Sequence, residues 1–238
     1  MTQKSKKLLL FDIDCTLVNT GGAGISAIQE AVRVVFGNEG PPLDLAGSTD
    51  SGIVRGLFTH FEREYDAAVE EEFYQVYLPL MEANLREESN GGRVLDGVPE
   101  LLAELEEAGH VLGLLTGNIE RGGWAKVSYY GLAKHFQFGS WGDDHWDRNL
   151  LGPIALERAN AYHGENFTAE DVIVIGDTCK DIACAHAIGA PCVAVATGSI
   201  SAEDLEKCGA DLVVDTLTDP RVLAFLNDGL PHPRTLPK

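Results

Sequence analysis

The sequence lacks the long apolar run that a membrane-spanning helix needs, because no stretch approaches about 20 consecutive apolar residues. A basic lead-in followed by the apolar residues 8–11 briefly imitates a signal peptide. However, Asp12 and Asp14 end the apolar run well before the roughly 7–15 residues of a signal-peptide core. We therefore predict a buried first strand at this position, and a cytoplasmic protein that does not contact a membrane.

Basic residues are also scarce: 18 Lys and Arg stand against 37 Asp and Glu, which gives a formal net charge of −19. Most of such a surface would repel a polyanion, so we expect no nucleic-acid partner. A small phosphorylated metabolite remains compatible with this charge, since a bound cation and one or two basic side chains can reverse the field inside a pocket.

The cysteines are few and scattered: there are five, with no C-x-x-C pair. An odd number without metal-ligand spacing argues against a disulfide framework or a zinc site and favours reduced thiols. Nothing in the sequence decides between a monomer and a dimer.

Apolar runs alternate with amphipathic stretches from about residue 92 onward. Together with the run at 8–13, the expected strands are 111–115, 136–138, 172–175, 192–195 and 212–214. The expected helices are 98–108, 121–130, 154–162, 181–188, 202–207 and 221–226, and four of them are followed by a glycine suited to ending a helix: Gly109, Gly131, Gly189 and Gly209. Continuous apolar strands separated by helices predict an α/β, doubly wound parallel sheet covered on both faces, a Rossmann-like core.

Residues 20–89 break this rhythm, because they contain helical patterns at 23–36, 50–61 and 66–88 but no convincing strand. Pro79 is expected to kink or divide the third helix. We therefore predict a helical insert at 20–89 within a core formed by residues 1–19 and 90–230, followed by a frayed tail at 231–238.

Acidic residues stand at the carboxyl ends of two of the expected strands: Asp12 and Asp14 at the end of the first, Asp177 and Asp181 beyond the strand at 172–175. Ligands of parallel sheets bind at the carboxyl ends of the strands, so these four side chains should converge. Clustered carboxylates are costly without a compensating cation, and their oxygens suit Mg²⁺. The sequence thus predicts a magnesium site at this edge.

Another strand, 111–115, is followed by Thr116, Gly117 and Asn118. Their hydroxyl and turn amides could hold phosphate oxygens at the same edge.

These motifs, D-x-D-x-T, then Thr, then G-D-x-x-x-D, resemble in their order the haloacid dehalogenase (HAD) superfamily. The early insert resembles the C1 cap of that superfamily, and residues 46–50 are similar to a cap segment of phosphoglycolate-phosphatase-like members. The resemblance implies a Mg²⁺-dependent phosphatase in which Asp12 attacks phosphorus and forms an aspartyl-phosphate. Asp14 would be the acid and then the base, and its presence favours phosphate esters over halides.

The same resemblance implies further roles. Asp12, Asp177 and the backbone carbonyl of Asp14 would bind Mg²⁺, with Asp181 binding it directly or supporting the ligands, and Thr116 and the amides after it would hold the phosphoryl group. In the cap segment, Thr49 and Asp50 are candidate substrate-binding residues, although both are also good residues for the start of a helix.

Two positions depart from the family pattern. Cys15 stands where the family has glycine; either the turn accepts a small side chain or the thiol is sensitive to oxidation. The lysine that steadies phosphate in the family is absent from residues 146–153. Arg148 is the natural substitute because its planar fork suits phosphate or carboxylate oxygens, and Lys126 is the second candidate. Each could instead be a solvated surface charge.

The favoured interpretation is a phosphatase acting on a small phosphomonoester, resembling phosphoglycolate phosphatase. A β-phosphoglucomutase-like phosphomutase would use the same nucleophile, and a non-catalytic binding protein could use the same scaffold. A response-regulator receiver also carries acidic residues at strand ends, but its single short domain would not explain the insert.

Overall fold

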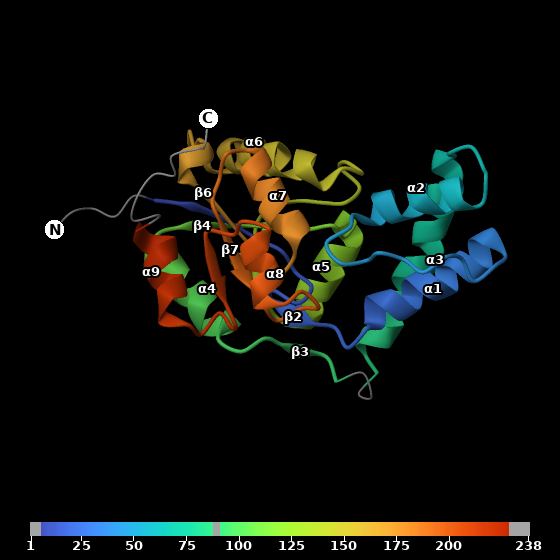
Figure 1. Ribbon diagram of the computed structural model, residues 1–238, viewed down its shortest axis with the longest axis horizontal. Helices are drawn as coiled ribbons and strands as arrows, with labels where there is room; N and C mark the ends of the chain where they lie inside the picture. Colours follow the sequence, from blue (N-terminus) through green and yellow to red (C-terminus); the bar gives the residue numbers. More distant parts are fainter. Residues whose placement is uncertain (1–5, 88–90, 229–238) are drawn as a thin grey trace.

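A six-stranded parallel sheet forms the centre of the computed structural model, which describes residues 6–87 and 91–228 (Figure 1). The strand order is β5-β4-β1-β6-β7-β8, and all neighbours run parallel. The strands are β1 (Leu8–Phe11), β4 (Val111–Leu115), β5 (Gly139–Ser140), β6 (Val172–Gly176), β7 (Cys192–Val195) and β8 (Leu212–Val214).

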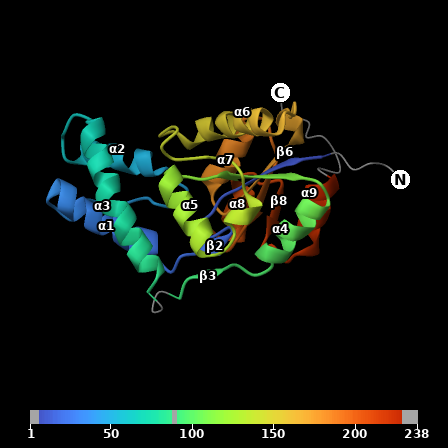
Figure 2. The same cartoon turned by 180° about the vertical axis from the view of Figure 1, so that it is seen from behind.

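Helices cover both faces of the sheet (Figures 1 and 2). Alternate residues of β1 belong to different apolar cores, one on each face. Leu9 and Phe11 belong to an apolar core shared with α4 (Val98–Glu107), α5 (Glu120–Tyr129) and α9 (Pro220–Asp228). Leu8 and Leu10 belong to a second core shared with α6 (Leu151–His163), α7 (Cys179–Ala187) and α8 (Ala202–Lys207). This arrangement confirms the predicted doubly wound α/β fold.

Three helices stand at one end of the sheet and pack mainly on one another: α1 (Ala23–Phe36), α2 (Asp50–His60) and α3 (Ala67–Leu85) (Figure 1). The chain leaves the core through β2 (Val18–Asn19) and returns through β3 (Arg93–Val94), which pair antiparallel. A helical insert is therefore present, and its exact boundaries at residues 20 and 89 stay a prediction. The predicted tail at 231–238 lies outside the described residues.

The secondary structure agrees with the sequence at the helix-end glycines and differs from it at Pro79 and at residues 136–138. All four glycines expected after helices have positive φ angles, between 73° and 90°, which confirms them as helix ends. The expected division of the third helix at Pro79 is wrong, because α3 continues through it. The strand expected at 136–138 is also wrong: Phe136 and Phe138 are apolar because each packs into a core, and β5 begins after them.

The prediction that the cysteines are reduced thiols is wrong for one pair, since Cys179 at the start of α7 is disulfide-bonded to Cys208 at the end of α8. Spacing alone did not reveal this contact, because the two residues are 29 positions apart and meet only when α8 packs beside α7. Cytoplasmic location, argued partly from reduced thiols, stays a prediction. Among the described helices, none combines the length and apolarity needed to cross a bilayer.

Candidate active site

The carboxyl ends of β1, β4 and β6 meet at the middle of the sheet, where the chain connections diverge to either side of β1. In open parallel sheets this switch point is where ligands bind. Asp12, Thr116 and Asp177 follow these three strands directly. They line a cavity of about 340 Å³, together with further residues of the core and with residues of the insert.

Asp12, Asp177 and Asp181 form a buried carboxylate cluster, with one oxygen of each residue within 4.8 Å of the others. Burial, strengthened by repulsion within the cluster, raises the pKa of Asp12 and of Asp177. A hard divalent cation bound by carboxylate oxygens would relieve this cost, and the donor set fits Mg²⁺. These three residues are therefore the ones that could hold the metal.

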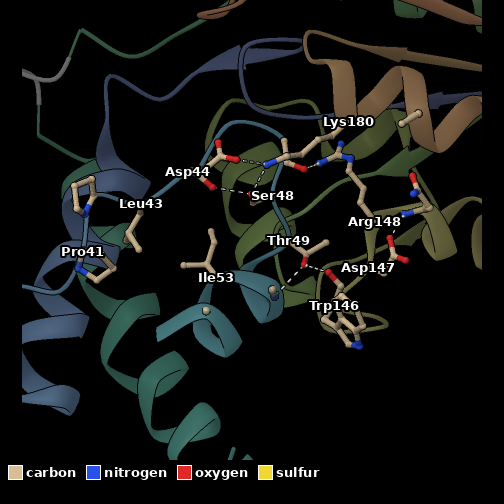
Figure 3. A pocket seen from close by; sticks show the side chains of 16 residues that line it. Pro41, Leu43, Asp44, Ser48, Thr49, Ile53, Trp146, Asp147, Arg148 and Lys180 are labelled. Atoms are coloured by element: carbon tan, nitrogen blue, oxygen red, sulfur yellow. Dashed lines mark hydrogen bonds and ion pairs between the residues drawn. The ribbon is translucent and has the colours of Figure 1, made fainter. Parts of the chain in front are cut away.

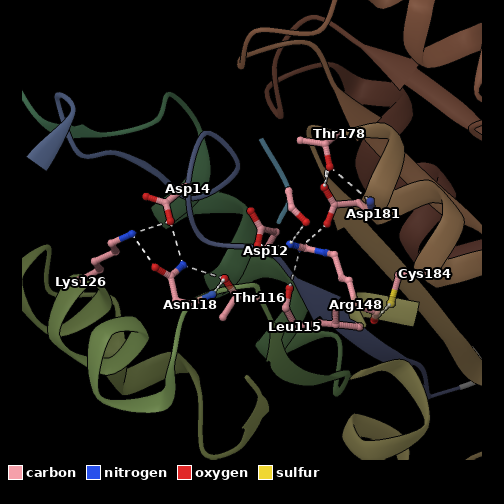
Figure 4. A network of polar contacts seen from close by, with 11 residues as sticks. Asp12, Asp14, Leu115, Thr116, Asn118, Lys126, Arg148, Thr178, Asp181 and Cys184 are labelled. Carbon is pink, nitrogen blue, oxygen red and sulfur yellow. Dashed lines mark hydrogen bonds and ion pairs between the residues drawn. The ribbon is translucent and has the colours of Figure 1, made fainter. Parts of the chain in front are cut away.

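Arg148 lies beside this cluster and is only 6% exposed, so it is not a surface charge. It belongs to the short helix η3 (Arg148–Leu150), and its Nη2 donates to Asp12 Oδ1 at 2.9 Å and to Asp181 Oδ1 (Figure 4). Its Nη1 donates to the carbonyl of Gly47 at 3.1 Å. Arg148 thus places a fixed cation next to the predicted nucleophile and ties the segment before α2 to it.

The Asp14 carboxylate faces away from the cluster, toward α5 (Figure 4). Its Oδ2 accepts hydrogen bonds from Lys126 Nζ at 2.6 Å and from Asn118 Nδ2 at 2.8 Å. Burial raises the pKa of Asp14, but Lys126 and Asn118 more than offset this and hold it below its ordinary value. The Asp14 side chain is therefore separate from the carboxylate cluster that could hold the metal, and only its backbone carbonyl remains a predicted ligand.

Lys126 is 3% exposed and also donates to Asn118 Oδ1 at 2.6 Å, so it is not a solvated charge either. Asn118 Nδ2 reaches Thr116 Oγ1 at 2.8 Å, which links the end of β4 to Asp14 and Lys126. The two candidate cations thus form ion pairs with different carboxylates: Arg148 with Asp12, and Lys126 with Asp14.

Cys15 has φ of 55°, the left-handed conformation that glycine adopts without cost. Burial and the carboxylates around it raise the pKa of its thiol to about 12. A thiol that stays protonated is a poor nucleophile toward peroxide. These observations favour a tolerated small side chain over a redox role.

Thr49 and Asp50 fasten the start of α2 to the core. Thr49 Oγ1 accepts from Gly52 N at 3.0 Å and donates to the carbonyl of Trp146 at 2.6 Å. Asp50 N donates to the carbonyl of Gly117 at 2.7 Å, and Asp50 Oδ2 accepts from Ile119 N at 2.9 Å. Asp50 lines the cavity but Thr49 does not, so the geometry offers no support for a substrate contact by Thr49.

A second cavity, of about 480 Å³, lies on the other side of the segment that carries Gly47 and Ser48 (Figure 3). The two cavities share Gly47, Ser48, Ile53 and Arg148 as walls. Lys180 Nζ donates there to Asp44 Oδ2 at 2.9 Å and to Ser48 Oγ at 2.6 Å. Because it contains none of the clustered carboxylates, this second cavity is not where we place the chemistry.

Asp50 was expected at the site from the sequence, but the sequence did not identify Ile25, Ile28 and Tyr77, which also come from the insert and line the first cavity. Their helical spacing predicts a packed core, and Ile28 and Tyr77 do belong to that core. Only the packing of the insert against the sheet shows that these side chains also face the carboxylates.

The fold and the site together define a Rossmann-like α/β protein with a helical insert over a carboxylate-rich switch point. A family described as haloacid dehalogenase-like hydrolase matches residues 9–195, and the chain belongs to this family.

The chain is 32% identical to an N-acetylmuramic acid 6-phosphate phosphatase of Pseudomonas aeruginosa, over 90% of this chain and 93% of that protein. It is 25% identical to a phosphoglycolate phosphatase of Mesorhizobium japonicum, over 82% and 84% of the two chains. The family and these relatives confirm the predicted enzyme class, a HAD-like phosphoric monoester hydrolase.

Among solved structures, CbbY of Rhodobacter sphaeroides with xylulose-1,5-bisphosphate has a TM-score of 0.72 at 17% identity. The match covers 90% of this chain and 96% of that one. At this identity the likeness shows the fold alone.

Proposed function

We propose that the enzyme hydrolyses a phosphomonoester of a small metabolite, with Mg²⁺, through an aspartyl-phosphate on Asp12. The observation that carries this proposal is the division of the carboxylates at the strand ends into two groups. Asp12 shares the cation-binding cluster with Asp177 and Asp181, whereas Asp14 is held apart by Lys126 and Asn118. A nucleophile and a separate proton-transfer group are what two-step phosphate transfer requires.

In the first step an Asp12 carboxylate oxygen attacks phosphorus, the ester P–O bond breaks, and Asp14 gives its proton to the departing alkoxide. In the second step a water molecule loses a proton to Asp14 and attacks phosphorus, and the Asp12–phosphorus bond breaks. Bound Mg²⁺ would supply positive charge that offsets the repulsion between the carboxylate and the phosphate. Arg148 keeps the Asp12 oxygen oriented and contributes a further positive charge.

Asp14 is ionised in the arrangement described here, since its pKa is lowered. That form suits the second step, in which it acts as a base. The approach of a phosphate dianion raises the pKa of a neighbouring carboxyl, which favours the protonated form needed for the first step. Lys126 and Asn118 therefore set where the Asp14 carboxyl lies and how easily it changes protonation state.

Phosphate release from a panel of phosphometabolites, with Mg²⁺ and with EDTA, tests the proposal. Asp12→Asn should abolish release, and Asp44→Asn, an equal charge change at an exposed residue, should not. Single-turnover samples quenched in acid should carry phosphate on Asp12. Activity that survives in Asp12→Asn, or that needs no divalent metal, would refute the mechanism. Conversion of a sugar bisphosphate with little phosphate release would indicate a phosphomutase, and inactivity on the whole panel would favour a binding protein.

A further inference from the structure

The wall of the first cavity that faces the carboxylates is largely apolar. It comes from the insert and the segment leading to α2, and it includes Ile25, Ile28, Leu45 and Ile53. Ile25 is 50% exposed although it is a large aliphatic side chain, so its apolar surface is available to a molecule entering the cavity. This wall can accept the carbon skeleton of a leaving alcohol, but its described residues offer that alcohol no positive charge.

Among the described residues that line the cavity, the basic ones are Lys126 and Arg148. Both are already paired: Lys126 with Asp14 at 2.6 Å, and Arg148 with Asp12 at 2.9 Å and with Asp181. Asp50 adds another buried carboxyl to the lining. A second anionic group on the substrate, close to the ester, would thus be buried without a free cation, which is strongly unfavourable.

Tyr77 on α3 adds a hydroxyl to this wall, which also contains the polar side chains of Thr20, Ser48 and Asp50. Tyr77 is 1% exposed and lines the cavity, and within residues 6–87 and 91–228 its hydroxyl makes no hydrogen bond. The hydroxyl oxygen is not among the fully buried, unpartnered side-chain atoms of the described residues, so it is open to the cavity and can bind a molecule there. A carbon placed on Gly24 would lie 3.8 Å from Tyr77 Oη and 3.5 Å from Lys126 Nζ, so the hydroxyl and the ammonium flank the same space. A substrate hydroxyl is the partner that this position fits.

We infer that the leaving alcohol is uncharged near the ester and carries a hydroxyl that Tyr77 binds, as in polyol or sugar phosphates. This inference rests on the phosphatase activity proposed above. It separates the enzyme from one selective for phosphoglycolate, whose carboxylate would have to lie against the apolar wall. Tyr77 is thereby assigned as a residue that determines specificity.

The test compares kcat/KM across the phosphate-release panel, extended with pairs that differ only in carboxylate against hydroxymethyl. Such pairs are 2-phosphoglycolate with 2-hydroxyethyl phosphate, and 3-phosphoglycerate with glycerol 3-phosphate. We expect esters without a nearby carboxylate to be preferred by tenfold or more. Equal or greater kcat/KM for esters carrying that carboxylate would overturn the inference and leave the phosphatase proposal standing. No release from any ester would instead count against the phosphatase proposal.

Tyr77→Phe isolates the hydroxyl contact. Loss of one hydrogen bond should lower kcat/KM for 2-hydroxyethyl phosphate about tenfold and leave ethyl phosphate, which has no hydroxyl, unchanged. Tyr74→Phe is the matched control, because the Tyr74 hydroxyl donates to Glu70 at 2.8 Å within the insert and does not line the cavity. An equal loss on both esters in Tyr77→Phe would show a merely structural role and refute the assignment.

Ile25→Arg tests the missing cation directly. Because Ile25 is half exposed, a longer polar side chain can be accommodated there without disturbing the core. The variant should raise kcat/KM for 2-phosphoglycolate relative to 2-hydroxyethyl phosphate. An unchanged ratio would contradict the view that the wall excludes the carboxylate for want of positive charge.

Discussion

Replacing Arg148 with methionine keeps most of the side-chain volume and removes the guanidinium between Asp12 and Asp181. Three carboxylates and one guanidinium give the cluster a formal charge of −2 when all are ionised; without Arg148 the charge becomes −3. The variant should therefore bind Mg²⁺ more tightly while turning over more slowly. These opposite effects distinguish a cation that serves the chemistry from one that only holds the fold.

The expected magnitudes follow from burial. Removing one partner of a buried ion pair costs about 3–5 kcal/mol, which for a chain of this size lowers Tm by roughly 10 °C in EDTA. Saturating Mg²⁺ should restore much of this loss, since the ion binds the folded state. Loss of a preorganised charge at the reacting group should lower kcat by about 10²–10³.

The assay is a Mg²⁺ titration of both turnover and Tm. Lys126→Met is the informative comparison: it should also slow turnover, but without tightening Mg²⁺ binding, because Lys126 pairs with Asp14 outside the cluster. Arg121→Met controls for net charge, since Arg121 lies on the surface of α5 and pairs with exposed Glu71. Unchanged turnover in Arg148→Met, with complete loss in Lys126→Met, would reverse the roles of the two cations. Weaker Mg²⁺ binding in Arg148→Met would refute the charge argument.

Three further predictions concern stability. In EDTA, the pKa of Asp12 is raised to about 7 and that of Asp177 to about 9, from an ordinary 3.8, so the folded state holds protons that the unfolded state has released. The free energy of unfolding should therefore fall as pH rises from about 5 to about 9. Mg²⁺ should flatten the curve of Tm against pH. Cys208→Ser, or reduction with dithiothreitol, should lower the free energy of unfolding by about 3–4 kcal/mol, because it opens the loop that the Cys179–Cys208 disulfide closes. A Tm unchanged by dithiothreitol would argue against the disulfide. Cys15→Gly should raise the free energy of unfolding by about 1 kcal/mol, because glycine adopts the positive φ without steric strain. The sensitivity of the enzyme to peroxide should not change. A lower free energy of unfolding in denaturant titrations would contradict this prediction.

Much of the core could be predicted because its signals are local. Buried parallel strands must be apolar on both faces, so runs such as Val111–Leu115 were visible without knowledge of their neighbours. Glycines at helix ends were visible for the same reason, since the left-handed conformation selects them. The prediction failed at 136–138, where an apolar run can pack into a core without forming strand hydrogen bonds.

The acidic positions at strand ends were also predictable, but the basic residue with which each carboxylate pairs was not. Asp14 and Asp181 are both acidic residues near a strand end, yet one faces Lys126 and the other faces Arg148. Both cations come from segments more than 30 residues away from these partners in sequence. Which cation meets which carboxylate depends on how α5 and η3 pack, and no local pattern encodes that.

The sequence by itself determined the class of chemistry: apolar strands that end in Asp12, Thr116 and Asp177 must place these groups at one edge of a parallel sheet. The tertiary structure decided the environment of those groups, because burial and pairing act between segments distant along the chain. It joined Cys179 to Cys208, and it placed the Tyr77 hydroxyl and apolar side chains of the insert in the same cavity as Asp12. In the mechanism proposed here, residues adjacent to strands carry out the reaction, and the packing of the insert over them selects the alcohol.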